Sequence, residues 1–268
     1  MPETANNEVT GGQRAVLSEI NVIINADDLD MSRNVNDATF ELMGIGQVTS
    51  ATMLANSPFI EEACERASKF PECSFGAHLN LTEFAPLTGP HDLDPILDAD
   101  GAFILRRILE IPIDSSLAKR VFEESCAQIE KLQSLGISVD HLDSHHHIHT
   151  LPRLFRVLKR IQKKYQIRRV RISRNIYAGD ENVSKTLLLK KHLYNFALKH
   201  YYRTKTTQGF TDLKVFIEHG AKGRLKYRTV ELMVHPGSDL YENDYDQLAE
   251  PWRQRLKFPV RLINYRDI

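Results

Sequence analysis

Short apolar runs alternate with amphipathic stretches along most of this chain. The run 20–25 (INVIIN) is mostly apolar and rich in β-branched residues, which is typical of a strand buried on both faces. Further strands are predicted at 48–54, 74–81, 139–142, 169–172 and 230–234. Helices are predicted at 35–43, 57–69, 117–135, 152–164 and 186–203. Strands that alternate with helices indicate an α/β fold with a parallel sheet.

The position of the polar motifs favours a barrel over an open sheet. These motifs directly follow predicted strands at several separate points. In a closed barrel the carboxyl ends of all strands meet on one face, whereas an open doubly wound sheet gathers fewer of them at one switch point. We therefore predict a (β/α) barrel that is irregular or has fewer than eight strands. Residues 20–268 are expected to form one domain after a flexible tail over 1–19. The Pro- and Asp-rich segment 84–114 is expected to cross the barrel mouth or to contact another subunit.

Composition excludes several classes of partner. The 268 residues include 35 basic and 35 acidic side chains, so nothing indicates binding to nucleic acid or to an anionic membrane. The basic run between Lys159 and Arg171 is interpreted as a solvated helix face. Three cysteines form no CxxC pair, the first twenty residues contain no apolar leader, and no apolar run approaches about 18 residues. A soluble cytoplasmic protein is therefore expected.

Two adjacent carboxylates end the first predicted strand. Asp27 and Asp28 repel each other and are costly to desolvate unless a cation lies beside them. The alternative interpretation is that the pair only caps the next helix.

Single histidines occur in two other strand motifs. His78 lies in the apolar alternation 76–82 (GAHLNLT), where a lone histidine is more often a core residue. His235 ends the strand 230–234 and precedes Pro236 and Gly237, so it is either an acid/base group at the barrel mouth or a turn residue.

The segment 140–149 (DHLDSHHHIH) is the strongest motif, with five histidines and two aspartates. Neutral imidazoles are common ligands of zinc-like ions, and Asp143 or Asp140 could orient a ligand through its second nitrogen. If the segment stays extended, His145, His147 and His149 share one side, and spacing does not choose among them.

Together these motifs suit a catalytic metal site. One carboxylate and two imidazoles leave coordination positions free for water and substrate. A second carboxylate beside the metal could take a proton from water, and a further histidine could protonate a leaving group.

The motifs NADD, GxHLxLT, HxDSHHHxH and a strand that ends in MVHP occur in the order seen in the YdjC-like carbohydrate deacetylases, and the chain resembles that family over about residues 20–240. The resemblance implies a barrel related to polysaccharide deacetylases, one divalent metal ion such as Mg or Zn, and removal of acetyl groups from N-acetylated amino sugars. It also implies a possible homodimer. The family often has Gly two residues after the acidic pair, where this chain has Asp30.

The same resemblance implies roles for individual residues. Asp28, His78 and His145 would bind the metal, Asp27 would be the general base, and His235 would be the acid for the leaving amine. Asp143, His147 and His149 would lie behind the ligands or contact the substrate. Arg171 and Arg174 either brace Asp27, grip the sugar or remain surface residues.

Two other functions fit the same residues. A phosphoesterase with two metals would need more carboxylates than this chain offers near Asp27 and Asp28. A non-catalytic module that binds metal or sugar would not need Asp27 beside the metal.

Overall fold

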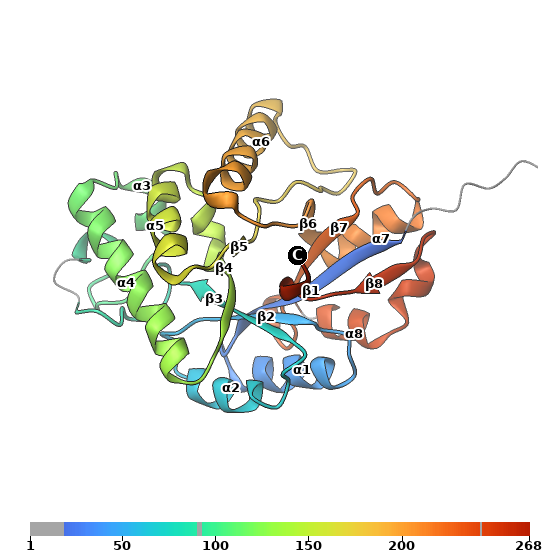
Figure 1. Cartoon of the computed structure of the whole chain (residues 1–268), viewed down its shortest axis with the longest axis horizontal. Helices are drawn as coiled ribbons and strands as arrows, with labels where there is room; N and C mark the ends of the chain where they lie inside the picture. The colour runs from blue at the N-terminus through green and yellow to red at the C-terminus, as the bar shows by residue number, and fades with distance from the viewer. Residues whose placement is uncertain (1–18, 90–92, 242) are drawn as a thin grey trace, which may run out of the picture.

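The computed structural model describes residues 19–89, 93–241 and 243–268. An eight-stranded parallel sheet curls through the middle of the molecule, with helices packed around its outside (Figure 1). The strand order is β5-β4-β3-β2-β1-β7-β6, and β8 pairs with β1. The α/β barrel class that the alternation predicts is confirmed. The strands are β1 Ile20–Leu29, β2 Ser50–Met53, β3 Ser74–Leu79, β4 Val139–Ser144, β5 Arg169–Val170, β6 Gly209–Asp212, β7 Thr229–Val234 and β8 Val260–Leu262.

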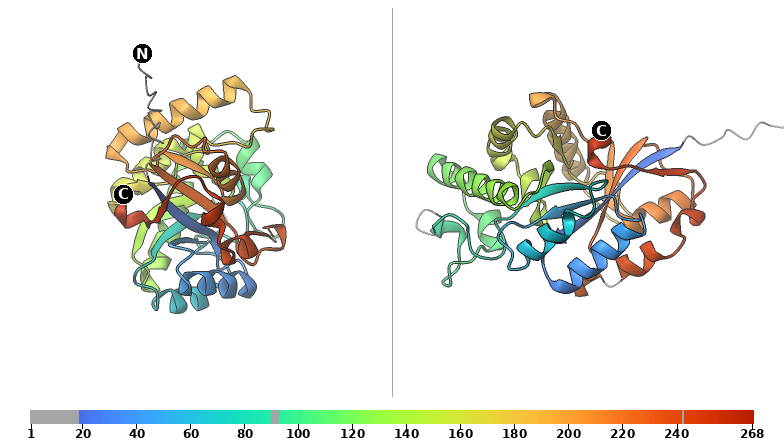
Figure 2. Two further views of the ribbon diagram at one scale, coloured as in Figure 1. Left: turned by 90° about the vertical axis from the view of Figure 1, so that its right-hand side faces the viewer. Right: turned by 60° about the horizontal axis from the view of Figure 1, so that its bottom comes forward.

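The helices lie along the outer face of the sheet, as the two further views show (Figure 2). The five predicted helices are present, and α3, α7 and α8 are additional. Short 3-10 turns, such as Pro152–Leu154 before α5, extend several of them. The helices are α1 Arg33–Gly44, α2 Ile60–Ala67, α3 Leu105–Glu110, α4 Ser115–Ser134, α5 Phe155–Tyr165, α6 Lys185–His200, α7 Leu213–Ala221 and α8 Asn243–Ala249.

The barrel is irregular, as predicted, and closes only through sparse contacts. β1 pairs with β7 along one edge, while its other edge meets β8 near its start and β2 near its end. The outer strands β5 and β6 do not pair directly in the described chain. Arg169 of β5 forms a bridge with Lys205, which precedes β6, and Phe210 of β6 forms hydrogen bonds with Asn175, which follows β5. β5 has only two residues, so it offers little edge for a regular ladder.

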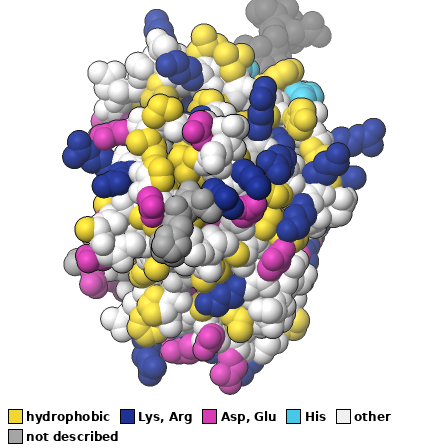
Figure 3. All heavy atoms as spheres, turned by 90° about the vertical axis from the view of Figure 1, so that its left-hand side faces the viewer, with side chains coloured by type: hydrophobic (Ala, Val, Ile, Leu, Met, Phe, Trp, Pro, Cys, Tyr) yellow, Lys and Arg dark blue, Asp and Glu magenta, His cyan; other side chains and the backbone are white. Residues whose placement is uncertain are grey.

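The basic run between Lys159 and Arg171 only partly forms the predicted solvated face. Arg160, Lys163 and Lys164 are exposed. On the face of the molecule shown in Figure 3, cations are interspersed with acidic and apolar side chains. Lys159 and Arg171 are buried instead. The Lys159 amine donates to the carbonyls of Leu198 and Tyr201 at the end of α6, which replaces the water that it loses. The prediction was wrong for these two residues because spacing cannot reveal a buried partner.

Other expectations concern the ends of the chain and its surroundings. The predicted tail lies outside the described residues except for exposed Glu19. In the described ranges, none of the helices combines the length and the apolarity that crossing a membrane requires. Cys64, Cys73 and Cys126 are buried and unpaired.

Candidate functional site

A bulge at the end of β1 brings both adjacent carboxylates to one cavity. Successive residues of a regular strand point to opposite faces, but the β1–β2 register shifts between Ala26 and Leu29, and Asp28 has φ +58°. Asp27 and Asp28 consequently both line a cavity of about 500 Å³ at the barrel mouth. Residues from β3, β7, α3 and the segments that follow β3, β4 and β7 complete its lining, including His78, Glu83, Leu105, Leu109, His145, His146, His147, Met233, His235 and Tyr241.

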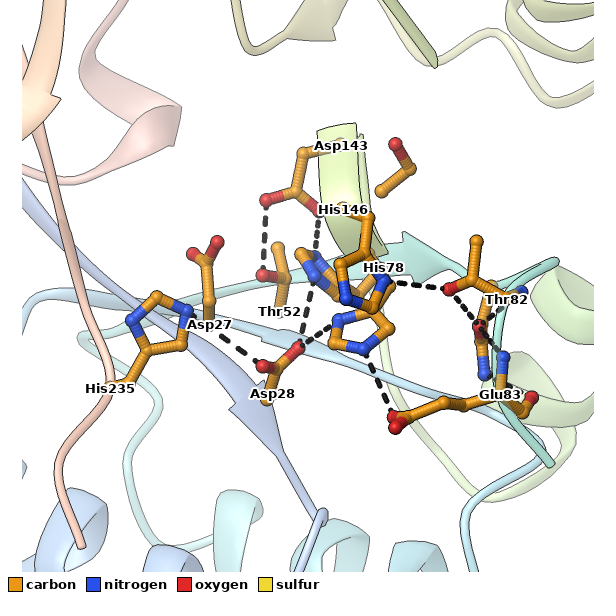
Figure 4. A network of polar contacts seen from close by, with 12 residues as sticks. Asp27, Asp28, Thr52, His78, Thr82, Glu83, Asp143, His146 and His235 are labelled. Carbon is orange, nitrogen blue, oxygen red and sulfur yellow. Dashed lines mark hydrogen bonds and ion pairs between the residues drawn. The ribbon is translucent and has the colours of Figure 1, made fainter. Parts of the chain in front are cut away.

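Three potential metal-binding atoms converge on one side of this cavity. Oδ1 of Asp28 lies 3.1 Å from Nε2 of His78 and 2.8 Å from Nδ1 of His145 (Figure 4). Asp28, His78 and His145 each offer one atom, all within 4.8 Å of one another. Oδ1 of Asp28 is buried and has no hydrogen-bond partner of normal geometry. A carboxylate and two imidazoles directed at one point are a donor set that fits a divalent ion.

His78 is held from behind by Asp143. Its Nδ1 lies 2.6 Å from Oδ1 of Asp143, which leaves Nε2 toward Asp28. Although burial opposes a charged ring, Asp143 and Asp28 raise the pKa of His78 well above its usual value when no metal is bound. Gly76 of β3 allows close packing against β4, because a Cβ at this position would lie 2.6 Å from the ring of His141.

Arg171 braces Asp27, which is one of the three roles that the sequence left open for it. Its guanidinium is fully buried and forms two hydrogen bonds to the Asp27 carboxylate, at 2.6 and 2.5 Å. It also lies 2.8 Å from Asp143 and 2.7 Å from Glu231. Burial raises the pKa of Asp27, but Arg171 outweighs that effect and holds the pKa well below its usual value. Asp27 therefore remains ionised and oriented toward the cavity.

His235 approaches the same carboxylates from β7. Its Nε2 lies 3.7 Å from Oδ2 of Asp28, and Figure 4 shows it across the Asp27–Asp28 pair from His78. Its ring stacks on Tyr241 at 4.0 Å, and its backbone N–H donates to Asp244. His235 thus faces the cavity without joining the triad of Asp28, His78 and His145.

The histidine-rich segment is not extended. His145–Thr150 forms a 3-10 turn, in which His146 and His147 adopt φ +51° and +55°. His145, His147 and His149 therefore do not share one side, and the extended geometry considered for this segment is wrong. His145 and His147 line the cavity, whereas His149 turns into the protein.

His149 and His147 have different surroundings. His149 accepts from the Ser144 hydroxyl at Nδ1 and donates from Nε2 to the carbonyl of Arg171, so it supports the backbone beneath Arg171. Burial and the charge of Arg171 lower the pKa of His147 to about 3, which keeps its ring neutral. Its edge packs against Phe210.

Arg174 lies outside the group around Asp27. It pairs with Glu181 at 2.7 Å and Asp212 at 3.1 Å, and it lines a neighbouring cavity of about 540 Å³. That second cavity shares His235 and Tyr241 with the first.

Three site residues were missed from the sequence. Glu83 contacts His145, Tyr241 stacks on His235, and Glu231 binds Arg171. Glu83 and Tyr241 belong to irregular segments with no motif, so no sequence signal distinguished them. Glu231 lies in an apolar strand, where a buried acid could have indicated a buried cation.

The segment 84–114 partly crosses the barrel mouth, as one of its two interpretations predicts. Leu105 and Leu109 of α3 line the cavity of about 500 Å³. Residues 90–92 lie outside the described residues.

The fold and this site define a class of protein: an α/β barrel with carboxylates and imidazoles gathered at the carboxyl ends of its strands. Residues 21–257 match the model of the YdjC-like protein family, and the chain belongs to that family. It is 32% identical over 216 residues to a carbohydrate deacetylase of Halalkalibacterium halodurans, covering 80% of this chain and 84% of the relative. It is 32% identical over 218 residues to a carbohydrate deacetylase of Vibrio vulnificus, covering 80% of this chain and 77% of that relative.

A solved structure supports the fold assignment. The crystal structure of a putative cellobiose-phosphate cleavage protein from Enterococcus faecalis V583 superposes with a TM-score of 0.73 at 24% identity. The match covers 93% of this chain and 99% of that chain. It shows that the barrel described here is shared by that protein.

Proposed function

We propose that this protein is a metal-dependent deacetylase that hydrolyses the N-acetyl group of an amino sugar or short oligosaccharide and releases acetate. The observation that carries the proposal is the convergence of Asp28, His78 and His145 beside an Asp27 carboxylate that Arg171 holds ionised. The relatives named carbohydrate deacetylases agree with this chemistry.

Asp28, His78 and His145 would hold the divalent ion, and Mg or Zn suits this mixed oxygen and nitrogen set. A bound divalent ion supplies Lewis-acid activation of water and of the acetyl carbonyl. The buried Oδ1 of Asp28, which has no hydrogen bond of normal geometry, and the two imidazole nitrogens facing it support this assignment.

Asp27 is proposed as the acceptor of the proton from the attacking water. Arg171 engages both carboxylate oxygens, which fixes the direction of the remaining lone pairs. A low pKa makes Asp27 a weak base in bulk water. It also guarantees that the carboxylate is ionised at neutral pH, when it is needed as an acceptor.

His235 is proposed as the donor of the proton to the leaving amine. It directly follows β7 and lies beyond Asp28 from the ring of His78 (Figure 4). Stacking on Tyr241 restricts its ring, so Nε2 stays directed into the cavity. A substrate amide between Asp27 and His235 would have an acceptor on one side and a donor on the other.

The phosphoesterase alternative would need a second metal ion. Asp27, His78 and Asp143 also bring potential ligand atoms within 4.8 Å of one another. Arg171 already occupies that position, however, with contacts to Asp27 and to Asp143 at 2.8 Å. A second cation there would face a fixed guanidinium, which favours one ion per chain.

The test is acetate release from a panel of N-acetylated mono- and disaccharides by protein stripped of metal and reloaded with Zn²⁺ or Mg²⁺. Reloaded wild type should release acetate, and Asp28→Ala should bind no ion and release none. An aryl phosphate run in parallel separates the phosphoesterase alternative. Binding of sugar without release of acetate from any substrate would leave a non-catalytic module and refute the proposal.

A further inference from the structure

Each proposed histidine ligand has a carboxylate behind it. Nδ1 of His78 faces Asp143, and Nε2 of His145 lies 3.1 Å from Oε2 of Glu83 (Figure 4). Carboxylates that accept from the second nitrogen of a ligand histidine fix its tautomer and raise its basicity. The two pairs are reversed: His78 turns Nε2 toward Asp28, whereas His145 turns Nδ1 toward it.

We infer that Glu83 is a positioning residue of the metal centre. By accepting the Nε2–H of His145, it holds that ring in the tautomer whose Nδ1 lone pair points toward Asp28. A neutral imidazole has one donor and one acceptor nitrogen, so a partner for the donor decides which nitrogen can ligate. This inference rests on the proposed metal site and adds to it the ligating atom of His145 and the residue that selects it.

The loop that carries Glu83 is fixed from both sides. The side-chain oxygen of Asn80 accepts the backbone N–H groups of Thr82 and Glu83, at 3.0 and 3.1 Å. The amide groups of Asn80 and Asn56 donate to the carbonyl of Glu83, at 2.8 and 3.2 Å. Asn80 also bonds to Asn56 directly. The backbone of Glu83 is therefore held at its donor and its acceptor, as a supporting residue for a ligand should be.

We expect that Glu83 can be substituted without disturbing the fold, whereas Asp143 cannot. Asp143 is fully buried and also contacts Thr52 and Arg171, so its removal would disturb several buried groups. The side chain of Glu83 is 47% exposed at the cavity wall. Changing Glu83 should consequently leave the fold intact.

The experiment compares wild type with Glu83→Ala and Glu83→Gln, and Glu130→Ala serves as the matched control. Glu130 pairs with Lys164 at 2.8 Å with similar exposure, but lies on α4 away from the cavity. Zn²⁺ affinity is measured by competition with a chromogenic chelator, and unfolding temperature is measured on metal-free protein. We expect Glu83→Ala to bind Zn²⁺ about 10–100-fold more weakly. Glu83→Gln should lose less, because its amide oxygen can still accept from Nε2–H.

A second measurement reports the tautomer itself. In ¹⁵N NMR spectra of Zn²⁺-loaded wild type, the His145 ring should show a protonated Nε2 and a metal-bound Nδ1. Glu130→Ala should give the wild-type affinity and spectrum, and metal-free Glu83→Ala should unfold at the wild-type temperature.

Different failures have different meanings. If Glu83→Ala binds Zn²⁺ within about twofold of wild type while His145→Ala loses it, the role of Glu83 is refuted and the metal centre stands. Ligation of His145 through Nε2 would also overturn the inference. If folded wild type binds no divalent ion, the proposed function and this inference both fail.

Discussion

Arg171 should contribute more to stability than any surface cation, because it is the buried countercharge of three carboxylates. Its contacts to Asp27, Asp143 and Glu231 are all 2.8 Å or shorter, and these side chains are at most 2% exposed. Arg171→Met keeps most of the volume but leaves those acids without their cation. Breaking a buried pair costs about 3–5 kcal/mol, and loss of three contacts places the expected cost in the upper part of that range. A melting temperature lower by roughly 8–20 °C should result.

The loss should depend on pH in a defined direction. In wild type, Arg171 lowers the pKa of Asp27 in the folded state. This interaction stabilises the fold at pH values above the unfolded pKa of Asp27, and the stabilisation is lost as pH falls. In Arg171→Met, burial without the cation should raise the folded-state pKa of the same acids. The folded variant then binds more protons than its unfolded chain, so its stability falls as pH rises. The deficit relative to wild type should be largest near pH 8 and smaller near pH 5.

Urea unfolding at both pH values measures this deficit, with emission of the single, fully buried Trp252 as the signal. Arg255→Ala is the control, since Arg255 pairs with Glu250 at 2.5 Å but both side chains are about half exposed. Such a pair is worth about 0–1 kcal/mol. A loss below about 1 kcal/mol in Arg171→Met, or the same loss at pH 5 and pH 8, would refute the reasoning.

Three further substitutions test the site. Asp27→Asn should lower turnover by about 10²–10⁴ with metal content unchanged, and near-normal acetate release would remove Asp27 from the mechanism. His235→Ala should lower turnover with metal affinity retained, whereas loss of bound metal would make His235 a ligand. Burial and the charge of Asp28 raise the pKa of Asp30 well above its usual value. Asp30 therefore ionises at lower pH in the unfolded chain than in the folded protein, and the free energy of unfolding falls as pH rises. Asp30→Asn should therefore be more stable than wild type at pH 8 and similar at pH 4, in chelator-treated urea titrations; an equal difference at both pH values would contradict this.

The strands that the sequence predicted are those with enough apolar residues to show a pattern. β1, β3 and β7 were found because each is a nearly continuous buried run. β6 (GFTD) and β8 (VRL) were missed, and each has at most two apolar residues. The strand β5 is shorter still, but it was found within the longer pattern RVRI at 169–172. α7 was missed for a related reason: its apolar run LKVFI is ambiguous between a strand and a buried helix.

The fold class predicted that the site residues would lie close together, but it did not predict how their side chains would be oriented. Asp27, His78, His145 and His235 follow or end strands, and a barrel brings such positions together. Glu83 is 62 residues from His145 in sequence and lies in a loop, so no local pattern connects the two. The sequence did not decide the role of Arg171, because its three buried carboxylate partners are far from it along the chain.

The backbone explains why these orientations leave so little trace in the sequence. Positive φ normally indicates glycine, yet eight other residues of the described chain adopt it. Five of the eight belong to segments around the cavity of about 500 Å³: Asp28, His146 and His147, which line it, and Asp30 and Phe84, which lie beside lining residues in the sequence. Left-handed backbone costs a non-glycine residue roughly 1–2 kcal/mol, and such conformations persist where the surroundings fix them. At Asp28, His146 and His147, glycine would relieve that cost but would remove a carboxylate or imidazole that lines the cavity. Asp30 shows that the turn does not depend on glycine either, because it holds φ +90° at a position where the family often has glycine. The barrel mouth is therefore shaped in part by non-glycine residues with left-handed backbone, and a sequence search for glycine turns does not detect it.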